Sequence, residues 1–532
     1  MALASVPDQS QLISRDELVS LASDASITIP EDEVEDFRVL VSAVDQAAQH
    51  MLKFEDYMPT VDFDLYPRTD IHIPDDTDMG GWATKATVRC TKPTSDLLKG
   101  RTVALKDNIA LAGVRCTNGT GAMDWTPTID ATITTRILDA GAVITGKAAC
   151  ENGCFGAISD TSVTGPVHNP YAPGYSCGGS SSGSGRLVAN GQVDMALGCD
   201  QGGSIRLPAA HCGLIGLKPT WGLVPYTGII SLEATIDHVG PMTKTTRDCA
   251  LLMDVTAGYD GIDDRVPPMV TPGYIKFTEG IDQILATDLP LKGKRIGILK
   301  EGFISDKMDA RVEKLVKSAA ESLRMHGAEV EECSIPLHSV SANAWMCALP
   351  IAGTRQGLLA DMTGRKQLYM TDRVEKAGRL MSQAAFDAFG AGGQNVYLRG
   401  LFLEKKYGPV LHARATNLMR KLTDDYNKAF EKYDVLVMPT LPTLAPTLNE
   451  GKVKPLARLS RTLGCTLNTA PFDFSGHPAL SVPVGFSSPL DNPSVKLPVG
   501  MQLVGRHYED LLCLQVAAVW EQATNWQDIY LS

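Results

Sequence analysis

Short apolar segments that are typical of buried strands alternate with segments of helical periodicity from Gly100 onward. Residues 102–105 (TVAL) form the first predicted strand, and residues 143–145 form the next. Between them, Asp130 is expected to cap a helix that ends at Gly141. Strands that alternate with helices predict an α/β fold, in which helices cover both faces of a layered sheet.

The same alternation continues in the C-terminal half of the chain. Residues 295–299 and 434–438 are predicted to be buried strands. A helix whose apolar side chains run from Val312 to Leu323 is expected to end at Gly327 and to be followed by extended chain. These segments extend the predicted sheet into the second half of the sequence.

Three parts of the chain differ in composition and pattern. Residues 1–90 begin with helical segments and continue as an Asp-, Pro- and Thr-rich stretch that is expected to wrap around the rest. Residues 91–338 and 431–532 form the predicted α/β core. Residues 339–430 are rich in Met, Arg and Lys and mostly helical in pattern, which predicts a helical insertion that caps the core.

The chain is acidic, with 49 Lys and Arg against 61 Asp and Glu in 532 residues and a formal net charge of −12. This charge argues against nucleic acid and against an anionic membrane surface as partners. No apolar run approaches the roughly 18 residues of a membrane span, and no secretory signal is visible. The 12 cysteines are scattered, which favours reduced thiols and a cytoplasmic location. Without zinc-like His and Cys spacing, neither a metal nor a cofactor is expected.

The glycine- and serine-rich segment at residues 175–220 is the most informative part of the sequence. Composition alone would favour a flexible linker. Three apolar runs that are typical of a protein core lie within the segment, at residues 187–189, 195–197 and 214–217. A flexible linker would not contain such runs, so we interpret the segment as ordered loops of a functional site.

The second half of this segment has the pattern of a strand, a turn and a helix. The predicted strand runs into Cys-Asp-Gln-Gly-Gly-Ser at residues 199–204, and a helix is expected to start near Ser204. Such a turn exposes backbone N–H groups that stabilise developing negative charge. Ser204 is therefore a candidate nucleophile, although a serine at a helix start can also be an N-cap. Asp200 and Arg206 flank the turn and are candidates for an ion pair that braces it.

A serine nucleophile needs a base, and Lys106 is the best candidate. It follows the first predicted strand, so its amine would be carried into the interior, where burial lowers a lysine pKa. A neutral amine near pH 7–8 is therefore expected, and the alternative is a lysine paired with Asp107. His211 is expected to be a packed side chain. The G-x-S-x-G match at residues 174–178 follows a loop rather than a strand and is set aside.

Three motifs together resemble those of a known family. They are VALKDNI around Lys106, GGSSSGSG at residues 178–185 and GCDQGGSIRLPAAHCGLIGLKPTWGLVPYTG at residues 198–228. Ser180 and Ser204 lie 204 − 180 = 24 residues apart, which is the family's spacing. The chain resembles the amidase signature hydrolases, and most closely the enantioselective amidases found beside nitrile hydratases. The resemblance implies a mixed, twisted sheet covered by helices on both faces, with an N-terminal helical segment and a helical insertion.

The resemblance also implies the roles of individual residues. Lys106 would be the base, Ser180 the bridging serine and Ser204 the acylated nucleophile of a Ser–cisSer–Lys triad, with a cis peptide bond before Ser180. Many members have glycine where this chain has Ser182, a departure that leaves the spacing intact. The oxyanion hole would consist of the backbone N–H groups of Gln201, Gly202, Gly203 and Ser204.

The implied activity is hydrolysis of small carboxylic amides to an acid and ammonia or an amine, through an acyl-enzyme. Because carbamates, esters and anilides present the same electrophile, a urethanase on the same triad is an alternative. Further alternatives are a catalytically inactive binding protein and an amidotransferase subunit. The pocket walls are expected to be apolar, and the candidate pocket residues are Cys154, Phe155, Ile229, Ile230 and Trp345.

The predicted helix after Pro30 carries an apolar stripe that predicts a partner. Val34, Phe37, Val41 and Val44 follow helical spacing on one face. A homodimer is therefore expected. The other expected partner is the substrate, a small-molecule amide.

Overall fold

The computed structural model describes residues 7–361, 364–377, 381–449, 451 and 453–532. The chain divides into two compact units, Met1–Pro59 and Thr60–Ser532. Residues 1–6 of the expected N-terminal segment and residues 362–363 and 378–380 of the expected insertion lie outside the described residues. Within the described ranges, none of the helices has the length and apolarity needed to cross a membrane.

The first unit is helical, as the sequence predicts. It comprises η1 (Gln9–Gln11), α1 (Arg15–Asp24), η2 (Glu31–Glu33) and α2 (Val34–Met51). The side chain of Ser14 caps α1, and acidic residues in the first turn of α2 suit the helix dipole. The apolar stripe of α2 is not fully covered, because Phe37, Leu40 and Val44 stay exposed.

The second unit is built on one mixed sheet of 13 strands. The sheet has the order β1-β2-β4-β3-β5-β7-β6-β11-β12-β10-β8-β9, and β13 pairs with β11. The strands are β1 (Arg68–His72), β2 (Trp82–Arg89), β3 (Thr102–Lys106), β4 (Val143–Ala148), β5 (Met195–Asp200), β6 (Ile215–Lys218), β7 (His238–Thr243), β8 (Arg295–Leu299), β9 (Glu329–Cys333), β10 (Val435–Pro439), β11 (Ala479–Ser487), β12 (Leu497–Val504) and β13 (Tyr530–Leu531).

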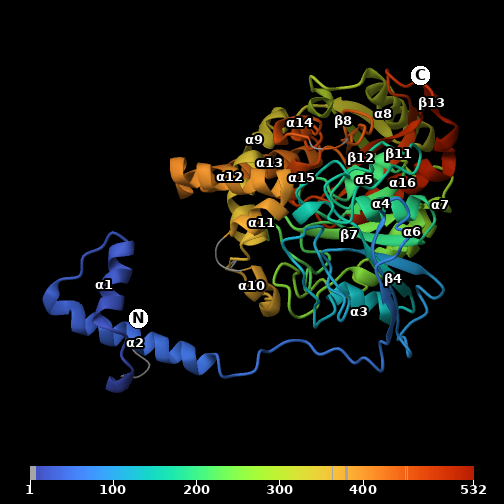
Figure 1. The fold of residues 1–532 in the computed structure, drawn as a ribbon. Helices are drawn as coiled ribbons and strands as arrows, with labels where there is room; N and C mark the ends of the chain where they lie inside the picture. The colour runs from blue at the N-terminus through green and yellow to red at the C-terminus, as the bar shows by residue number, and fades with distance from the viewer. Residues whose placement is uncertain (1–6, 362–363, 378–380, 450, 452) are drawn as a thin grey trace. The chain divides into compact units, whose positions relative to one another are not determined.

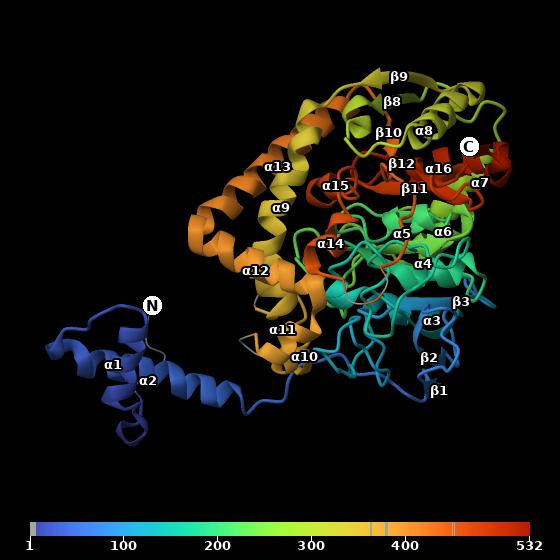
Figure 2. The ribbon, with the colours of Figure 1, turned by 45° about the horizontal axis from the view of Figure 1, so that its top comes forward.

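Helices cover both faces of this sheet (Figures 1 and 2). Side chains of α3, α6, α7, α8 and α16 join the largest core cluster, whereas α4 and α5 pack into a separate one. The helices are α3 (Thr132–Asp139), α4 (Ser182–Ala189), α5 (Arg206–His211), α6 (Thr246–Thr256), α7 (Phe277–Leu285), α8 (Ala310–Ser322), α14 (Pro455–Ser460), α15 (Ala470–Ser475) and α16 (Asp510–Ala523), with short turns η3 (Asn152–Cys154), η4 (Lys300–Phe303), η5 (Leu323–His326) and η8 (Trp526–Asp528). The α/β architecture predicted from the sequence is confirmed.

The predicted insertion is helical in its described residues. Figure 2 shows α9, α12 and α13 stacked beside one another. They belong to a series of η6 (Pro336–Val340), α9 (Ser341–Ala352), the π-helix η7 (Gly353–Leu358), α10 (Thr371–Ala377), α11 (Gln383–Ala388), α12 (Gly390–Tyr407) and α13 (Pro409–Phe430). Part of this series contacts the site described below.

Two local expectations were wrong. The segment expected to wrap around the core contains β1 and β2, which extend the sheet at one edge. The sequence does not reveal β1 because its residues are mostly exposed and lack an apolar alternation. Asp130 does not cap α3, whose N-cap is Ala131. Its carboxylate instead accepts the N–H of Ala112 and pairs with Arg68 of β1.

Candidate active site

Lys106 lies at the carboxyl end of β3, in the middle of the parallel part of the sheet. Strand β3 pairs in parallel with β4 and β5, so its last residue lies at the same sheet edge as Asp200, the last residue of β5. The Lys106 side chain is fully buried. Its Nζ donates to Ser180 Oγ at 2.8 Å and to the Cys199 carbonyl at 3.3 Å. The sheet thus brings the predicted base and the predicted bridging serine into direct contact.

Lys106 does not pair with Asp107, which was the alternative left open by the sequence. The Asp107 carboxylate lies 3.3 Å from Lys147 Nζ and accepts hydrogen bonds from the N–H and hydroxyl of Thr117 at 3.0 and 2.5 Å. Among the described residues, no carboxylate lies within ion-pairing distance of Lys106. A second buried lysine, which sequence reasoning missed, therefore satisfies Asp107 and leaves Lys106 without an acidic partner.

Ser180 belongs to the turn that leads into α4. The peptide bond between Gly179 and Ser180 is cis, as the resemblance implies. The N–H of Ser181 donates to the Ser204 carbonyl at 3.2 Å, and the Ser181 hydroxyl lies 3.3 Å from both the N and the O of Cys199. These bonds tie the turn that carries Ser180 to the loop that carries Ser204.

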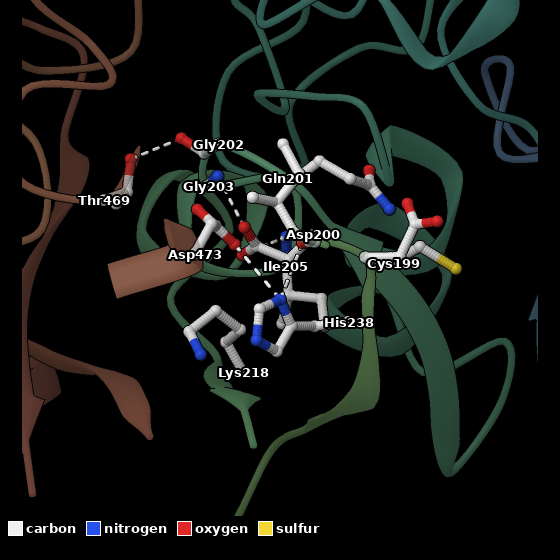
Figure 3. Close-up of polar contacts among 12 residues, drawn as sticks. Cys199, Asp200, Gln201, Gly202, Gly203, Ile205, Lys218, His238, Thr469 and Asp473 are labelled. Carbon is white, nitrogen blue, oxygen red and sulfur yellow. Dashed lines mark hydrogen bonds and ion pairs between the residues drawn. The ribbon is translucent and has the colours of Figure 1, made fainter. Parts of the chain in front are cut away.

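The nucleophile loop, residues 201–204, is held from outside through its carbonyl groups. Trp345 Nε1 donates to the Gln201 carbonyl at 3.0 Å, and Thr469 Oγ1 donates to the Gly202 carbonyl at 2.5 Å (Figure 3). Ser204 is half-buried and precedes α5, which begins at Arg206 with Ile205 as its N-cap. Ser204 is therefore not the N-cap of this helix, which removes the structural alternative for this serine.

The backbone N–H groups of this loop differ in whether they have a partner. The N–H of Gly203 donates to Asp200 Oδ1 at 2.5 Å. The N–H groups of Gln201, Gly202 and Ser204 have no hydrogen-bond partner within the described part of the chain. Three of the four predicted oxyanion donors are thus unoccupied.

A cluster of buried charges lies against the loop, which we call the paired cluster: Asp200, Arg206 and Asp473. Arg206 lies 2.8 Å from each of the two carboxylates. Burial works to raise the pKa of Asp200, but the Arg206 guanidinium holds it well below its usual range. Figure 3 shows Lys218 and His238 beside this group. The bracing pair of Asp200 and Arg206 is confirmed, whereas Asp473 was missed because it is distant in sequence.

The pKa of Lys106 is raised rather than lowered, so the expectation of a neutral amine near pH 7–8 does not hold for the free protein. Burial is the largest effect and lowers this pKa, but Cys154, Cys199, Cys150 and the Asp200 carboxylate together raise it by more. The pKa of Cys154 is lowered to about 6, first by a hydrogen bond with Cys150 and then, against burial, by Lys106 and Ser180. Burial raises the pKa of Cys199 to about 11, so Cys154 is the thiol that balances the charge of Lys106 at neutral pH.

A small cavity of about 10 Å³, room for about one water molecule, adjoins this loop. The structure places Cys154 and Ile230 in its lining, together with Gln201 of the loop. The other three pocket candidates are not in the lining: Ile229 forms a bridge with Ile109 in the core, and Phe155 and Trp345 pack around Leu232, Ile236 and Leu349. The remaining lining residues are Asn108, Asn118, Gly153, Ser231, Leu232 and Gly357. The walls are more polar than the sequence predicted.

The two other serine and histidine candidates lie as expected. His211 is buried, burial lowers its pKa to about 4, and its ring nitrogens have no hydrogen-bond partner among the described residues. Ser176, in the G-x-S-x-G match, lies in irregular chain and accepts the N–H of Gly178 at 2.8 Å. Neither residue contributes to the contacts around Lys106.

The mixed sheet and the serine-rich loops at its edge are shared with a class of hydrolases that act on amides. The chain belongs to the Amidase family, whose model matches residues 76–514. It is 39% identical over 442 residues to an enantioselective amidase of Rhodococcus rhodochrous, covering 81% of each chain. It is 34% identical over 430 residues to a glutamyl-tRNA(Gln) amidotransferase subunit of Synechococcus sp. (strain RCC307), covering 80% of this chain and 84% of the relative.

A solved structure supports the same relationship. The native peptide amidase of Stenotrophomonas maltophilia superimposes with a TM-score of 0.64 at 28% identity, covering 81% of this chain and 84% of that one. A 6-aminohexanoate cyclic dimer hydrolase, at 24% identity and a TM-score of 0.68, shares the fold.

Proposed function

We propose that this protein hydrolyses small carboxylic amides to an acid and ammonia or an amine, through an acyl-enzyme on Ser204. The observation that carries the proposal is the 2.8 Å contact between Lys106 Nζ and Ser180 Oγ, in a fully buried position where no carboxylate of the described residues lies within ion-pairing distance. A buried amine and a hydroxyl in contact form a proton relay that a serine nucleophile needs.

The proposed reaction moves one proton through two hydroxyl groups. Neutral Lys106 accepts the proton of Ser180, which accepts that of Ser204 as the Ser204 oxygen attacks the amide carbon. The N–H groups of Gln201, Gly202 and Ser204 stabilise the resulting oxyanion. Ser180 then donates a proton to the leaving nitrogen, and Lys106 returns one to Ser180. Water attacks the acyl-enzyme by the same route and releases the acid.

Cys154 supplies the proton balance that this reaction requires. In the free protein, the pair consists of the Lys106 ammonium and the Cys154 thiolate. Transfer of one proton to the thiolate produces the neutral amine without release of a proton to solvent, and the titration belongs to the pair rather than to either group. Lys106 can therefore act as a base although its pKa is raised.

The lining of the cavity supports a small substrate. The cavity volume of about 10 Å³ lies far below the ~300–1,000 Å³ of sites for drug-sized ligands, so its walls must move apart to admit even a small amide. The amides of Asn108 and Asn118 provide polar groups in its lining, and Ile230 and Leu232 provide apolar ones. The same cavity and triad would accept carbamates, esters and anilides, so urethane hydrolysis is the second candidate activity.

The amidotransferase alternative rests on the similarity of this chain to proteins of that class. It requires glutamine hydrolysis that depends on a partner protein. Glutamine turnover by the isolated chain, measured beside acetamide and benzamide, distinguishes the two activities.

We also propose that the protein is a homodimer in the cytoplasm. The exposed apolar side chains of α2 support a dimer. Light scattering after gel filtration tests it, and a monomer at all concentrations would contradict it.

The central experiment is a hydrolysis panel of acetamide, propionamide, benzamide, an anilide, an ester and ethyl carbamate. We expect turnover of the small primary amides and its complete loss in Ser204→Ala. A Ser204→Ala variant that still hydrolyses the panel would refute the proposed acyl-enzyme.

A further inference from the structure

Glu151 is a buried carboxyl group without a cation. It follows β4 and is fully buried. Its Oε2 accepts hydrogen bonds from the Thr161 hydroxyl at 2.5 Å, the Thr161 N–H at 3.0 Å and the Asp160 N–H at 3.2 Å. Among the described residues, it has no ion-pair partner. A buried carboxyl that is left without a counter-charge is costly, so its retention calls for a reason.

The same residue makes two contacts with the turn that carries Ser180. The backbone N–H of Glu151 donates to the Ser180 carbonyl at 3.0 Å. Glu151 Oε1 lies 3.1 Å from the hydroxyl of Ser182, which follows Ser180 by two residues. Glu151 therefore contacts this turn through both its main chain and its side chain.

The side chain of Glu151 also fills the space behind the Gly179–Ser180 peptide. A Cβ atom on Gly179 would lie 2.7 Å from Glu151 Cγ, and one on Gly156 would lie 3.1 Å from Glu151 Cβ. The side chain thus packs against both glycines, which also lie close to each other, since a Cβ on Gly179 would lie 2.6 Å from the Gly156 carbonyl oxygen. The turn that carries Ser180 is consequently packed against the Glu151 side chain.

Other charged groups near Glu151 are already engaged. The Asp160 carboxylate pairs with Arg458 at 3.0 Å and accepts the side-chain amide of Asn449 at 2.6 Å. Burial is the main reason that the pKa of Glu151 is raised to about 8. At neutral pH the group is therefore mostly a neutral acid, which can donate to the Ser182 hydroxyl while its other oxygen accepts the three bonds above.

We propose that Glu151 is a positioning residue that fixes the Ser180 hydroxyl between Lys106 and Ser204. This inference rests on the proposed function. The relay requires Ser180 Oγ to accept from one side and donate to the other, and a displacement of about 1 Å at such a group can reduce the rate ~100-fold. Ser182 provides the hydroxyl through which the Glu151 carboxyl supports this turn.

The test compares Glu151→Ala, Glu151→Gln, Ser182→Ala and the double variant Glu151→Ala/Ser182→Ala, with kcat and KM measured separately. We expect Glu151→Ala to lower kcat ~100-fold with KM changed less than about threefold. Glu151→Gln should stay within about tenfold of wild type, because its amide provides the same acceptor and donor as the neutral acid. The double variant should be no slower than Glu151→Ala, because both substitutions break one connection.

Asp510 provides a matched control. It is another fully buried carboxyl with a raised pKa, and it accepts the N–H and hydroxyl of Thr220 at 2.7 and 2.6 Å, without contact to the triad residues. We expect Asp510→Asn to change the melting temperature but not kcat per folded molecule. A merely structural role of Glu151 would produce this same pattern.

Three results would overturn the inference: wild-type kcat in Glu151→Ala, equal kcat in Glu151→Ala and Glu151→Gln, or additive losses in the double variant. If Glu151→Ala does not fold, Ser182→Ala tests the inference instead. A lower kcat at constant KM in Ser182→Ala supports the inference, and an unchanged kcat overturns it. An active Ser204→Ala would refute the proposed function instead. An inactive Ser204→Ala beside a fully active Glu151→Ala would refute this inference alone.

Discussion

Two buried groups adjoin the nucleophile loop, and they differ in how completely their charges are satisfied. In the paired cluster, Arg206 contacts Asp200 and Asp473, and it also donates to the Thr469 carbonyl and to Gln502 at 2.9 Å. On the other side, Lys106 has a hydroxyl, a carbonyl and a thiol as its partners, and no carboxylate in the described part of the chain lies within ion-pairing distance of it. Satisfied charges fix geometry, whereas a sparsely satisfied amine can exchange its proton. The comparison therefore indicates that the paired cluster holds the nucleophile loop in place, whereas Lys106 takes part in proton transfer.

The largest expected effect comes from removing the chemical group. Ser204→Ala and Lys106→Ala should each lower kcat by about 10⁴-fold or more, as removal of catalytic serines and their bases does in other serine hydrolases. Purified variants are compared in the amide panel, and a fluorophosphonate probe should label wild type and not Ser204→Ala. Turnover near wild type in either variant would contradict the division of roles.

The second prediction contrasts the stability of the two groups. Arg206→Met leaves the Asp200 carboxylate buried without its cation, beside Asp473, whose pKa burial raises, and we expect it to destabilise the fold by about 3–5 kcal/mol. Lys106→Met removes an amine whose counter-charge, the Cys154 thiolate, can be neutralised by taking up a proton, so the stability of this variant should stay within about 1 kcal/mol of wild type. Urea unfolding measures both. Equal destabilisation by the two substitutions would show that the charges are satisfied to the same degree.

This contrast also explains how far sequence reasoning reaches. The strands β3, β5 and β8 were predicted correctly because apolar runs are local signals, and the cis peptide bond was implied by the family resemblance. The neighbours that determine charge were not predicted. Lys147 forms the ion pair with Asp107 that Lys106 could have formed. Asp473 pairs with Arg206 although the two are 267 residues apart in the sequence. Such pairings depend on sheet register and on chain crossings that no local pattern encodes.

The pocket shows the same limit. Cys154 and Ile230 were predicted and line the cavity, but the apolar criterion also selected Ile229, Phe155 and Trp345, which pack elsewhere. Trp345 contributes through its indole N–H to the Gln201 carbonyl, a role that apolarity does not suggest. Asn108 and Asn118 were missed, although Asn108 lies only two residues after Lys106.

The third prediction concerns the pH dependence on the Lys106 side. The pKa of Cys154 is about 6, so below this pH the thiolate takes up a proton and can no longer accept one from Lys106. Amide hydrolysis should therefore fall as the pH decreases through about 6. In Cys154→Ala this limb should disappear or move by at least about one pH unit, because Lys106 then titrates alone.

The profile of kcat/KM between pH 4.5 and 9 for wild type and Cys154→Ala tests this assignment, with Cys465→Ala as the control. Cys465 is a partly buried thiol whose pKa burial raises to about 12, so its removal should leave the limb in place. A limb that stays at about pH 6 in Cys154→Ala would assign it to another group.

The smallest expected effect tests the support of the loop on its other side. Thr469→Val removes the hydroxyl that donates to the Gly202 carbonyl at 2.5 Å while the side-chain volume is nearly kept. A single hydrogen bond of this kind contributes about 0.5–1.5 kcal/mol, so kcat should fall about threefold to tenfold, because the bond holds the Gly202–Gly203 peptide that lies between the proposed oxyanion donors Gly202 N–H and Ser204 N–H. Thr440→Val is the matched control, because Thr440 is equally buried and pairs with Ser481 at 2.9 Å. It should lower stability without lowering kcat. Equal losses of kcat in the two variants would mean that kcat follows the stability of the fold in general. The contact between Thr469 and the loop would then have no specific effect on the reaction.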